Sequence, residues 1–204
     1  MTHDVAAAYD FAAPQFKSDL APDSTSRAAL EKWSALLSPG ARVMDVGCGA
    51  GRATRWLEEF GCAVLSLDLS TEMLRRTGEG RPGARVALAD MLSLPVTPES
   101  FDGLTAFFSV THIPKVEVPR VLNGFHRALK PGGALLVAVV RGEEEGEEAH
   151  HWTGGHVLHF SAFDEAELAT LLEAAGFCVI GGHGGEAVFH GQWEKHIFMF
   201  ARRS

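Results

Sequence analysis

The feature that most constrains the fold of this chain is a short apolar run that leads directly into a glycine-rich turn. Residues 43–51 read Val-Met-Asp-Val-Gly-Cys-Gly-Ala-Gly. Glycine permits a tight turn with positive φ and lets a ligand approach the main chain without meeting a Cβ atom. A buried strand followed by such a turn is typical of α/β proteins that bind ligands at the carboxyl ends of parallel strands.

Short apolar runs alternate with amphipathic segments along the rest of the chain, as in βα units. Two C-terminal strands have no helix-length segment between them, so we expect an antiparallel pair at one sheet edge. The sequence therefore predicts an α/β fold: a Rossmann-like, doubly wound, mostly parallel seven-stranded sheet with an antiparallel hairpin at one edge and helices on both faces. The expected strands span 42–46, 63–67, 85–89, 101–108, 134–140, 177–181 and 195–202.

The residues at the ends of these elements and between them predict several local features. Ser70 is placed to cap a helix, and Ser161 with Asp164 resembles a capping box that opens the last helix. The acidic run 143–148 and the glycine-rich stretch 181–185 are expected to be exposed loops. With 204 residues, of which 46% are apolar, the chain is expected to fold as a single domain, 1–204.

Charge and composition exclude several classes of protein. Lys and Arg number 18 against 26 Asp and Glu, and no basic stripe is visible, so a nucleic-acid partner is disfavoured. No run of eighteen apolar residues and no signal peptide is visible, which disfavours a membrane protein. Three cysteines without metal or disulfide spacing fit reduced thiols. We therefore expect a soluble cytoplasmic protein without a metal.

Three aspartates follow consecutive predicted strands: Asp45, Asp68 and Asp90. Because the carboxyl ends of parallel strands meet at one edge of a sheet, these carboxylates are expected on the same rim. Each one alone also fits a capping or surface aspartate. Their shared position favours a ligand site over that simpler interpretation.

The glycine turn departs from the dinucleotide-binding pattern. That pattern has a glycine three residues after Gly49, whereas this chain has Arg52. Asp45, at the end of the first strand, would repel a diphosphate and favour a ligand that carries positive charge. The turn therefore suits a cationic ligand better than a pyrophosphate.

The other two acids suit a nucleoside. Asp68 lies 19 residues after Gly49, where a carboxylate can accept hydrogen bonds from both ribose hydroxyls. Asp90 could accept a hydrogen bond from an adenine amino group, while Leu69 and Met91 cover the ring faces. Together the acids predict a nucleoside site along one edge of the sheet.

With these motifs in place, the chain resembles the class I S-adenosylmethionine-dependent methyltransferases, and within them small-molecule enzymes such as those that methylate ubiquinone and menaquinone. The resemblance covers residues 41–140 well and the remainder more loosely. It rests on the glycine turn, on Asp68, and on three further segments: Asp90-Met91, Phe101-Asp102 and Leu129–Gly133.

The resemblance implies S-adenosyl-L-methionine as the cofactor and methyl transfer to a small-molecule acceptor by in-line displacement. It places Gly47 and Gly49 along the methionine part of the cofactor, with Asp45 near its ammonium group. Phe107 and His112, just after the fourth strand, would stand near the methyl group.

The resemblance also implies two covering segments. Residues 1–23 would form an N-terminal cap, in which Tyr9 and Phe16 occupy positions where relatives often have two tyrosines over the cofactor. Phe16 lacks the hydroxyl of that pattern. Residues 142–160 would form a loop or lid beside the acceptor.

Histidines are the candidates for acid–base chemistry because their pKa lies near neutrality. His112 is the leading candidate for a base, although a histidine there could simply cap a turn. The acceptor pocket is predicted to include His112 and four residues of the lid: His151, Trp152, His156 and His159. A metal bound by this histidine cluster is disfavoured because no cysteine pair or carboxylate stands at a characteristic spacing.

Two other functions stay open at this level. A noncatalytic S-adenosylmethionine-binding regulatory protein would show the same motifs, because methyl transfer requires no obligatory catalytic side chain. An NAD-dependent oxidoreductase is disfavoured by the glycine spacing and by Arg52. The identity of the acceptor, the accepting atom and the oligomeric state are not determined by the sequence.

Overall fold

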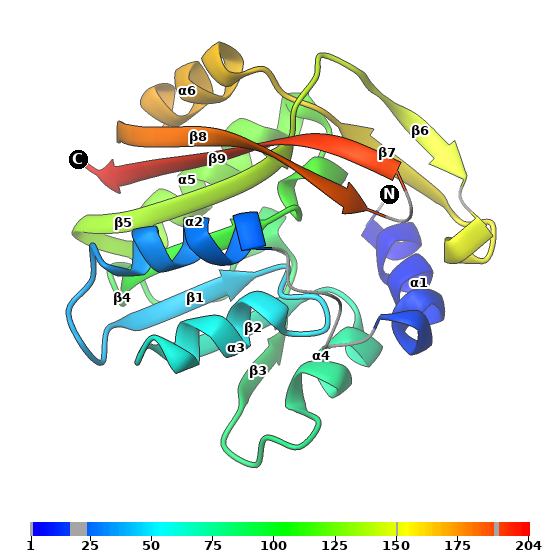
Figure 1. The fold of residues 1–204 in the computed structure, drawn as a ribbon, viewed down its shortest axis with the longest axis horizontal. Helices are drawn as coiled ribbons and strands as arrows, with labels where there is room; N and C mark the ends of the chain where they lie inside the picture. Colours follow the sequence, from blue (N-terminus) through cyan, green and yellow to red (C-terminus); the bar gives the residue numbers. More distant parts are fainter. Residues whose placement is uncertain (1, 17–23, 150, 190–191) are drawn as a thin grey trace.

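The computed structural model describes residues 2–16, 24–149, 151–189 and 192–204, and its centre is a twisted sheet with helices on both faces (Figure 1). Seven strands follow the order β3-β2-β1-β4-β5-β9-β8. Strands β1 to β5 pair in parallel, and β9 runs antiparallel to both β5 and β8. The predicted fold class is confirmed. The strands are β1 (Arg42–Val46), β2 (Ala63–Asp68), β3 (Arg85–Leu88), β4 (Phe101–Phe107), β5 (Leu129–Val140), β8 (Phe177–Phe189) and β9 (Gln192–Arg203).

Six helices cover the described part of the sheet and its rim. On one face, Trp33 of α2 and Leu57 of α3 pack with Phe198 of β9. On the other, Phe125 of α5 and Leu172 of α6 pack in a second apolar cluster. Alternate residues along a strand belong to different clusters, because successive side chains point to opposite faces of the sheet. The helices are α1 (Thr2–Ala12), α2 (Ser24–Ser34), α3 (Arg52–Glu59), α4 (Thr71–Gly78), α5 (Val118–Ala128) and α6 (Glu165–Ala174).

Helix starts follow the expected capping chemistry in one case and depart from it in another. The Ser70 hydroxyl accepts the Met73 N–H at 3.1 Å, so the predicted cap of α4 is confirmed. The capping box with Ser161 is wrong: Asp164 caps α6 by accepting the Glu167 N–H at 2.8 Å. Ser161 instead ends a strand, and its hydroxyl donates to the Ile113 carbonyl.

The segment expected to be a loop or lid contains a β-hairpin. Strand β6 (Glu145–Ala149) pairs antiparallel with β7 (Val157–Ser161), so the acidic run 143–148 is largely a strand and not a loop. All five residues of β6 are exposed. Backbone pairing holds this strand, without the alternation of apolar residues that marks a half-buried one.

The glycine-rich stretch 181–185 also lies within a strand. β8 pairs with β9 continuously beyond a register shift between Val179 and Gly181. A Cβ atom at Gly182 would lie 2.8 Å from the Phe198 carbonyl oxygen, so close strand approach requires glycine there. The prediction of an exposed loop was therefore wrong.

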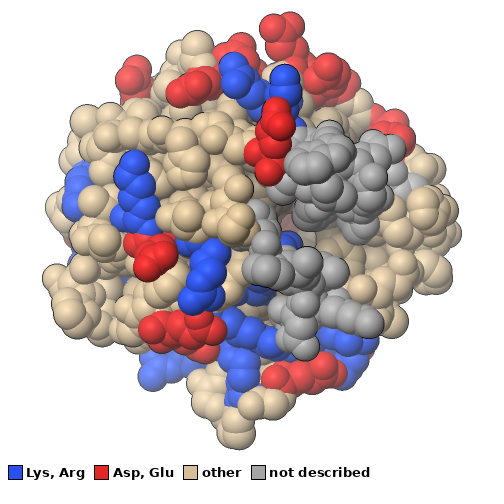
Figure 2. Space-filling model, in the orientation of Figure 1, with Lys and Arg blue, Asp and Glu red and all other residues tan. Residues whose placement is uncertain are grey.

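Helix α1 lies beside the β6–β7 hairpin, at the end of the sheet where β1 terminates (Figure 1). Residues 2–16 of the expected N-terminal cap form α1 and a short 3-10 turn, and residues 17–23 lie outside the described residues. Among the described residues, no helix has the length and apolar character needed to cross a membrane. Lys and Arg side chains are interspersed with Asp and Glu on the face shown in Figure 2.

Candidate cofactor and acceptor site

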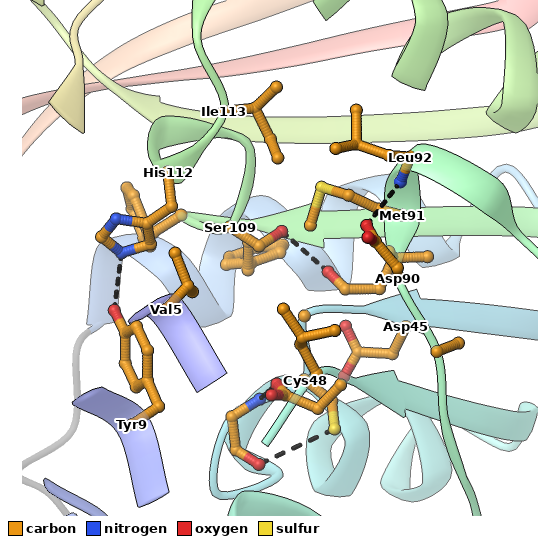
Figure 3. Close-up of a pocket in the computed structure, with 18 of the residues that line it drawn as sticks. Val5, Tyr9, Asp45, Cys48, Asp90, Met91, Leu92, Ser109, His112 and Ile113 are labelled. Carbon is orange, nitrogen blue, oxygen red and sulfur yellow. Dashed lines mark hydrogen bonds between the residues drawn. The ribbon is translucent and has the colours of Figure 1, made fainter. Parts of the chain in front are cut away.

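A cavity of about 560 Å³ opens over the carboxyl ends of the parallel strands. Its size is ordinary for a small-molecule site. Its wall includes every residue that the sequence predicted for the cofactor: Tyr9, Asp45, Gly47, Gly49, Asp68, Leu69, Asp90, Met91 and Phe107. Residues separated by up to 98 positions in the chain thus meet around one space, and several of them are labelled in Figure 3.

The glycine turn is shaped by backbone angles that favour glycine. Gly47, Gly49 and Gly51 have φ values of +69°, +54° and +81°. A Cβ atom at Gly47 would lie 2.2 Å from the Ser109 Cβ atom, whereas one at Gly49 would have no neighbour within 4 Å. Ser109 donates a hydrogen bond to the Val46 carbonyl at 2.8 Å. The turn is therefore packed against Ser109, in the segment after β4, on one side and is open at Gly49.

Asp45 lies at the base of the cavity and is fully buried. Its carboxylate accepts hydrogen bonds from the Thr54 hydroxyl at 2.6 Å and the Thr105 hydroxyl at 3.0 Å. Burial raises its pKa to about 6, against the opposing effect of these hydrogen bonds. A nearby positive charge would favour the ionised form, because it would offset the cost of desolvation. Sequence spacing gave no signal for the two threonines.

Asp68 connects the end of β2 to the glycine turn. Its carboxylate accepts the Gly49 N–H at 2.8 Å and the Ser70 N–H at 2.9 Å, one on each oxygen. Burial raises its pKa, and the backbone hydrogen bonds oppose that effect. Each carboxylate oxygen can accept a further hydrogen bond. The side chain therefore orders the turn and still has acceptor capacity for ribose hydroxyls.

Asp10 is a residue that sequence reasoning missed. It lies on α1 and accepts hydrogen bonds from the Ser70 hydroxyl at 2.5 Å and from the Glu72 N–H at 3.1 Å. These contacts attach α1 to the start of α4. Since the partners lie 60 or more positions away, no local pattern could have identified this role.

Asp90 lies at the third strand end and opens a 3-10 turn by accepting the Leu92 N–H at 2.9 Å. Leu69 and Met91 also line the cavity. A carboxylate flanked by apolar walls agrees with the arrangement expected around an adenine ring.

The cap and the strand ends meet at a pair of polar side chains. Figure 3 shows Tyr9 of α1 facing His112, with the Tyr9 oxygen 2.6 Å from His112 Nε2. The other ring nitrogen of His112 lies 3.0 Å from the His159 carbonyl oxygen of β7. The Tyr9 ring also meets the Phe16 and Trp152 rings, with centroids 5.9 and 5.8 Å apart.

The residues predicted for the acceptor pocket divide into two groups. His112 and His159 line the cavity. Trp152 packs behind Tyr9, His151 is exposed in the turn of the hairpin, and His156 is partly buried, and none of these three is on the cavity wall. These three residues lie in the turn of the hairpin, and only part of that turn and one side of each strand can face the cavity. Within the described ranges, no cluster of three potential metal ligands occurs.

The order of the sheet, the open glycine turn and the carboxylates at three successive strand ends define the class I S-adenosylmethionine-dependent methyltransferases. The chain belongs to this class: the family model described as "Methyltransferase domain" matches residues 16–180. The cofactor that this class implies is S-adenosylmethionine. The residues present fit that cofactor, because the turn is open at Gly49 and the buried carboxylates of Asp45 and Asp68 line the cavity, where they could face a cation and accept hydrogen bonds.

Individual relatives agree with this assignment. A demethylmenaquinone methyltransferase of Renibacterium salmoninarum is 33% identical over 141 residues, covering 66% of this chain and 58% of the relative. The chain thus spans less than two thirds of that relative. An uncharacterized methyltransferase of Synechocystis is 29% identical over 157 residues, covering 72% and 71%. A solved methyltransferase of Methanosarcina mazei shares the fold with a TM-score of 0.74 and 21% identity, covering 83% and 95%.

Proposed function

We propose that this methyltransferase acts on a small, largely apolar acceptor that loses a proton from oxygen or nitrogen during the reaction. The observation that carries the proposal is the continuation of the cavity beyond the cofactor residues to His112 and His159. This end combines apolar walls with a few polar groups, as small-molecule sites do. The relative from Renibacterium is named for demethylmenaquinone, which is likewise a largely apolar molecule.

In this proposal each strand end holds one part of the cofactor. Asp68 accepts hydrogen bonds from the ribose, Asp90 from the adenine amino group, and Asp45 lies nearest the ammonium group, directly or through water. Gly47 and Gly49 leave room for the methionine part. When bound, S-adenosylmethionine supplies a methyl group already activated by a positively charged sulfur.

The protein then has to align the acceptor and exclude water, which can lower a barrier by about 7 to 11 kcal/mol in favourable cases. Phe107, the last residue of β4, lines the cavity and contributes an apolar wall at that point. His112 removes the proton of the acceptor, since its imidazole lines the cavity and contacts both the cap, at Tyr9, and strand β7, at the His159 carbonyl.

Calorimetry with S-adenosylhomocysteine tests the cofactor assignment. Asp68→Ala removes a carboxylate expected to accept two ribose hydrogen bonds, each worth about 1.5 to 3 kcal/mol, so affinity should fall about 100-fold or more. Asp102→Ala is the matched control, because Asp102 binds Lys130 and the Arg42 N–H away from the cavity. Equal affinity of the wild type and Asp68→Ala, with both folded, would contradict the placement of the ribose.

Transfer of a labelled methyl group tests the reaction. The acceptor panel contains reduced demethylmenaquinone with a short side chain, simple phenols and primary amines. We expect labelled product from at least one of the hydroxylated aromatic compounds and none with His112→Gln. Transfer to none of the panel by the wild type would refute the proposed acceptor class.

A further inference from the structure

Three groups from distant parts of the chain form a continuous line of hydrogen bonds beside the cavity. The Tyr9 oxygen lies 2.6 Å from His112 Nε2, and His112 Nδ1 lies 3.0 Å from the His159 carbonyl oxygen. A carbonyl oxygen can only accept a hydrogen bond, so Nδ1 carries the proton of the neutral imidazole. Nε2 therefore holds the lone pair, and the Tyr9 hydroxyl donates to it.

The state of Tyr9 follows from its surroundings. Burial, together with the negative charge of Asp68, raises the pKa of the Tyr9 hydroxyl well above its usual range. At neutral pH Tyr9 is thus a phenol with a proton to donate. This proton points at Nε2, and both Tyr9 and His112 line the cavity, so the hydrogen-bonded pair borders the space that an acceptor would occupy.

Neighbouring side chains hold the two ends of this line of hydrogen bonds, at His159 and at Tyr9. His159 Nε2 lies 3.2 Å from the Glu145 carboxylate and 3.0 Å from the Ser161 hydroxyl, which holds the β7 end of the line. The Tyr9 ring packs edge-on against Trp152 of the hairpin turn. The line is therefore built by contacts from α1, from the segment after β4 and from the hairpin.

We propose that Tyr9 is a catalytic residue that relays the proton of the acceptor to His112, an inference that rests on the proposed function. The bond between hydrogen and the acceptor oxygen breaks, and that proton passes to the Tyr9 oxygen. At the same time the phenolic proton of Tyr9 passes to His112 Nε2. Tyr9 ends neutral, His112 ends as an imidazolium that donates to both neighbours, and the freed electron pair of the acceptor forms the bond to the methyl carbon. The sulfur keeps the electron pair of the bond that breaks.

Nitrogen NMR of the full-length protein tests the arrangement without any acceptor. Histidine labelled with ¹⁵N is observed with S-adenosylhomocysteine bound, and His112→Gln assigns the relevant signals. We expect a protonated Nδ1 and an unprotonated Nε2 at His112, with the Nε2 signal shifting in Tyr9→Phe. A proton on Nε2 in the neutral ring, or an Nε2 signal unaffected by Tyr9→Phe, would overturn the relay.

Tyr9 is the single tyrosine of the chain, so a ¹³C label at the phenolic carbon reports on this residue alone. We expect its signal to respond to His112→Gln at neutral pH, where the phenol stays protonated. Titration of the phenol near its ordinary pKa in both proteins would show that it is not held against His112, and would also overturn the proposal.

Kinetic measurements with the acceptor that the panel identifies distinguish a proton relay through Tyr9 from a role in which Tyr9 only covers the cavity. Tyr9→Phe keeps the ring contacts and loses only the hydroxyl, so kcat should fall about 100-fold, the lower end for acid–base catalysis, with the KM for the cofactor nearly unchanged. Phe11→Ala is the contrasting variant, since Phe11 lies on the same helix and its ring packs beside Gly154 of the hairpin turn. The Phe11→Ala substitution loosens the N-terminal cap and should chiefly change the KM for the cofactor.

The outcomes distinguish the two proposals. Methyl transfer by Tyr9→Phe at the wild-type kcat would refute the relay and leave the proposed function intact. Transfer to no acceptor by the wild type would refute the proposed function, whatever the NMR spectra show of the hydrogen bonds.

Discussion

Replacing the buried Asp45 by asparagine should make the protein more stable and a weaker binder of its cofactor. Asp45 is fully buried, and its pKa rises from 3.8 to about 6, chiefly through desolvation. Since each tenfold change in proton affinity is worth 1.36 kcal/mol, holding the charged form costs about 3 kcal/mol. An asparagine side chain has the same shape, and its amide can still hydrogen-bond with Thr54 and Thr105.

The dependence on pH gives this prediction its sign. The folded protein binds the proton of Asp45 more tightly than the unfolded chain does. Below pH 3.8 the residue is neutral in both states and costs nothing. As the pH rises to about 6 the wild type loses stability relative to Asp45→Asn, and above that pH the full difference of about 3 kcal/mol is present.

Urea denaturation followed by tryptophan fluorescence, at pH 4 and pH 8, measures the difference between the two proteins. Asp102→Asn is a control of opposite sign, because the hydrogen bond from Lys130 lowers the pKa of Asp102. There the wild type should gain stability relative to the variant as the pH rises. A difference between wild type and Asp45→Asn that is the same at both pH values would refute the reasoning. Saturating S-adenosylhomocysteine, which carries the ammonium group, should stabilise the wild type more than the variant.

Three further results are expected. Gly47→Ala should lower the unfolding free energy by more than about 1 kcal/mol and reduce cofactor binding, because the new Cβ atom meets Ser109. Gly49→Ala should have smaller effects, because its Cβ atom meets no neighbour. Thermal melts and calorimetry compare the two variants. Trp33→Ala should cost about 3 to 5 kcal/mol in urea denaturation because the ring is fully buried. Affinity for S-adenosylhomocysteine should decrease as the pH falls below about 6, where Asp45 takes up a proton; calorimetry at pH 5 and pH 8 that gives equal affinities would contradict this.

The parts of the structure that the sequence predicted depend on local signals. The period of apolar residues identified the parallel strands, and the glycine turn marked the strand end over which the cavity lies. Asp45, Asp68 and Asp90 could be placed because each lies within two residues of the end of a strand. Such signals lie within a few residues of one another, so the sequence alone is enough to detect them.

The parts that escaped prediction depend on contacts across the chain. Tyr9 and His112 are separated by 103 positions, and Thr105 lies 60 positions from Asp45. The hairpin escaped for another reason: every residue of β6 is exposed, so only main-chain pairing with β7 distinguishes it from a loop. Propensity and pattern have no access to either kind of information.

Two neighbouring residues of α1, Tyr9 and Asp10, make hydrogen bonds to distant parts of the chain. Successive residues of a helix are about 100° apart around its axis, and these two attach the helix to two different parts of the chain, Tyr9 to His112 and Asp10 to the first turn of α4. Because α1 is rigid, it cannot move away from His112 and keep its hydrogen bonds to the start of α4. Any displacement of α1 from the cavity would therefore have to break the contacts of Tyr9 and of Asp10 in the same movement.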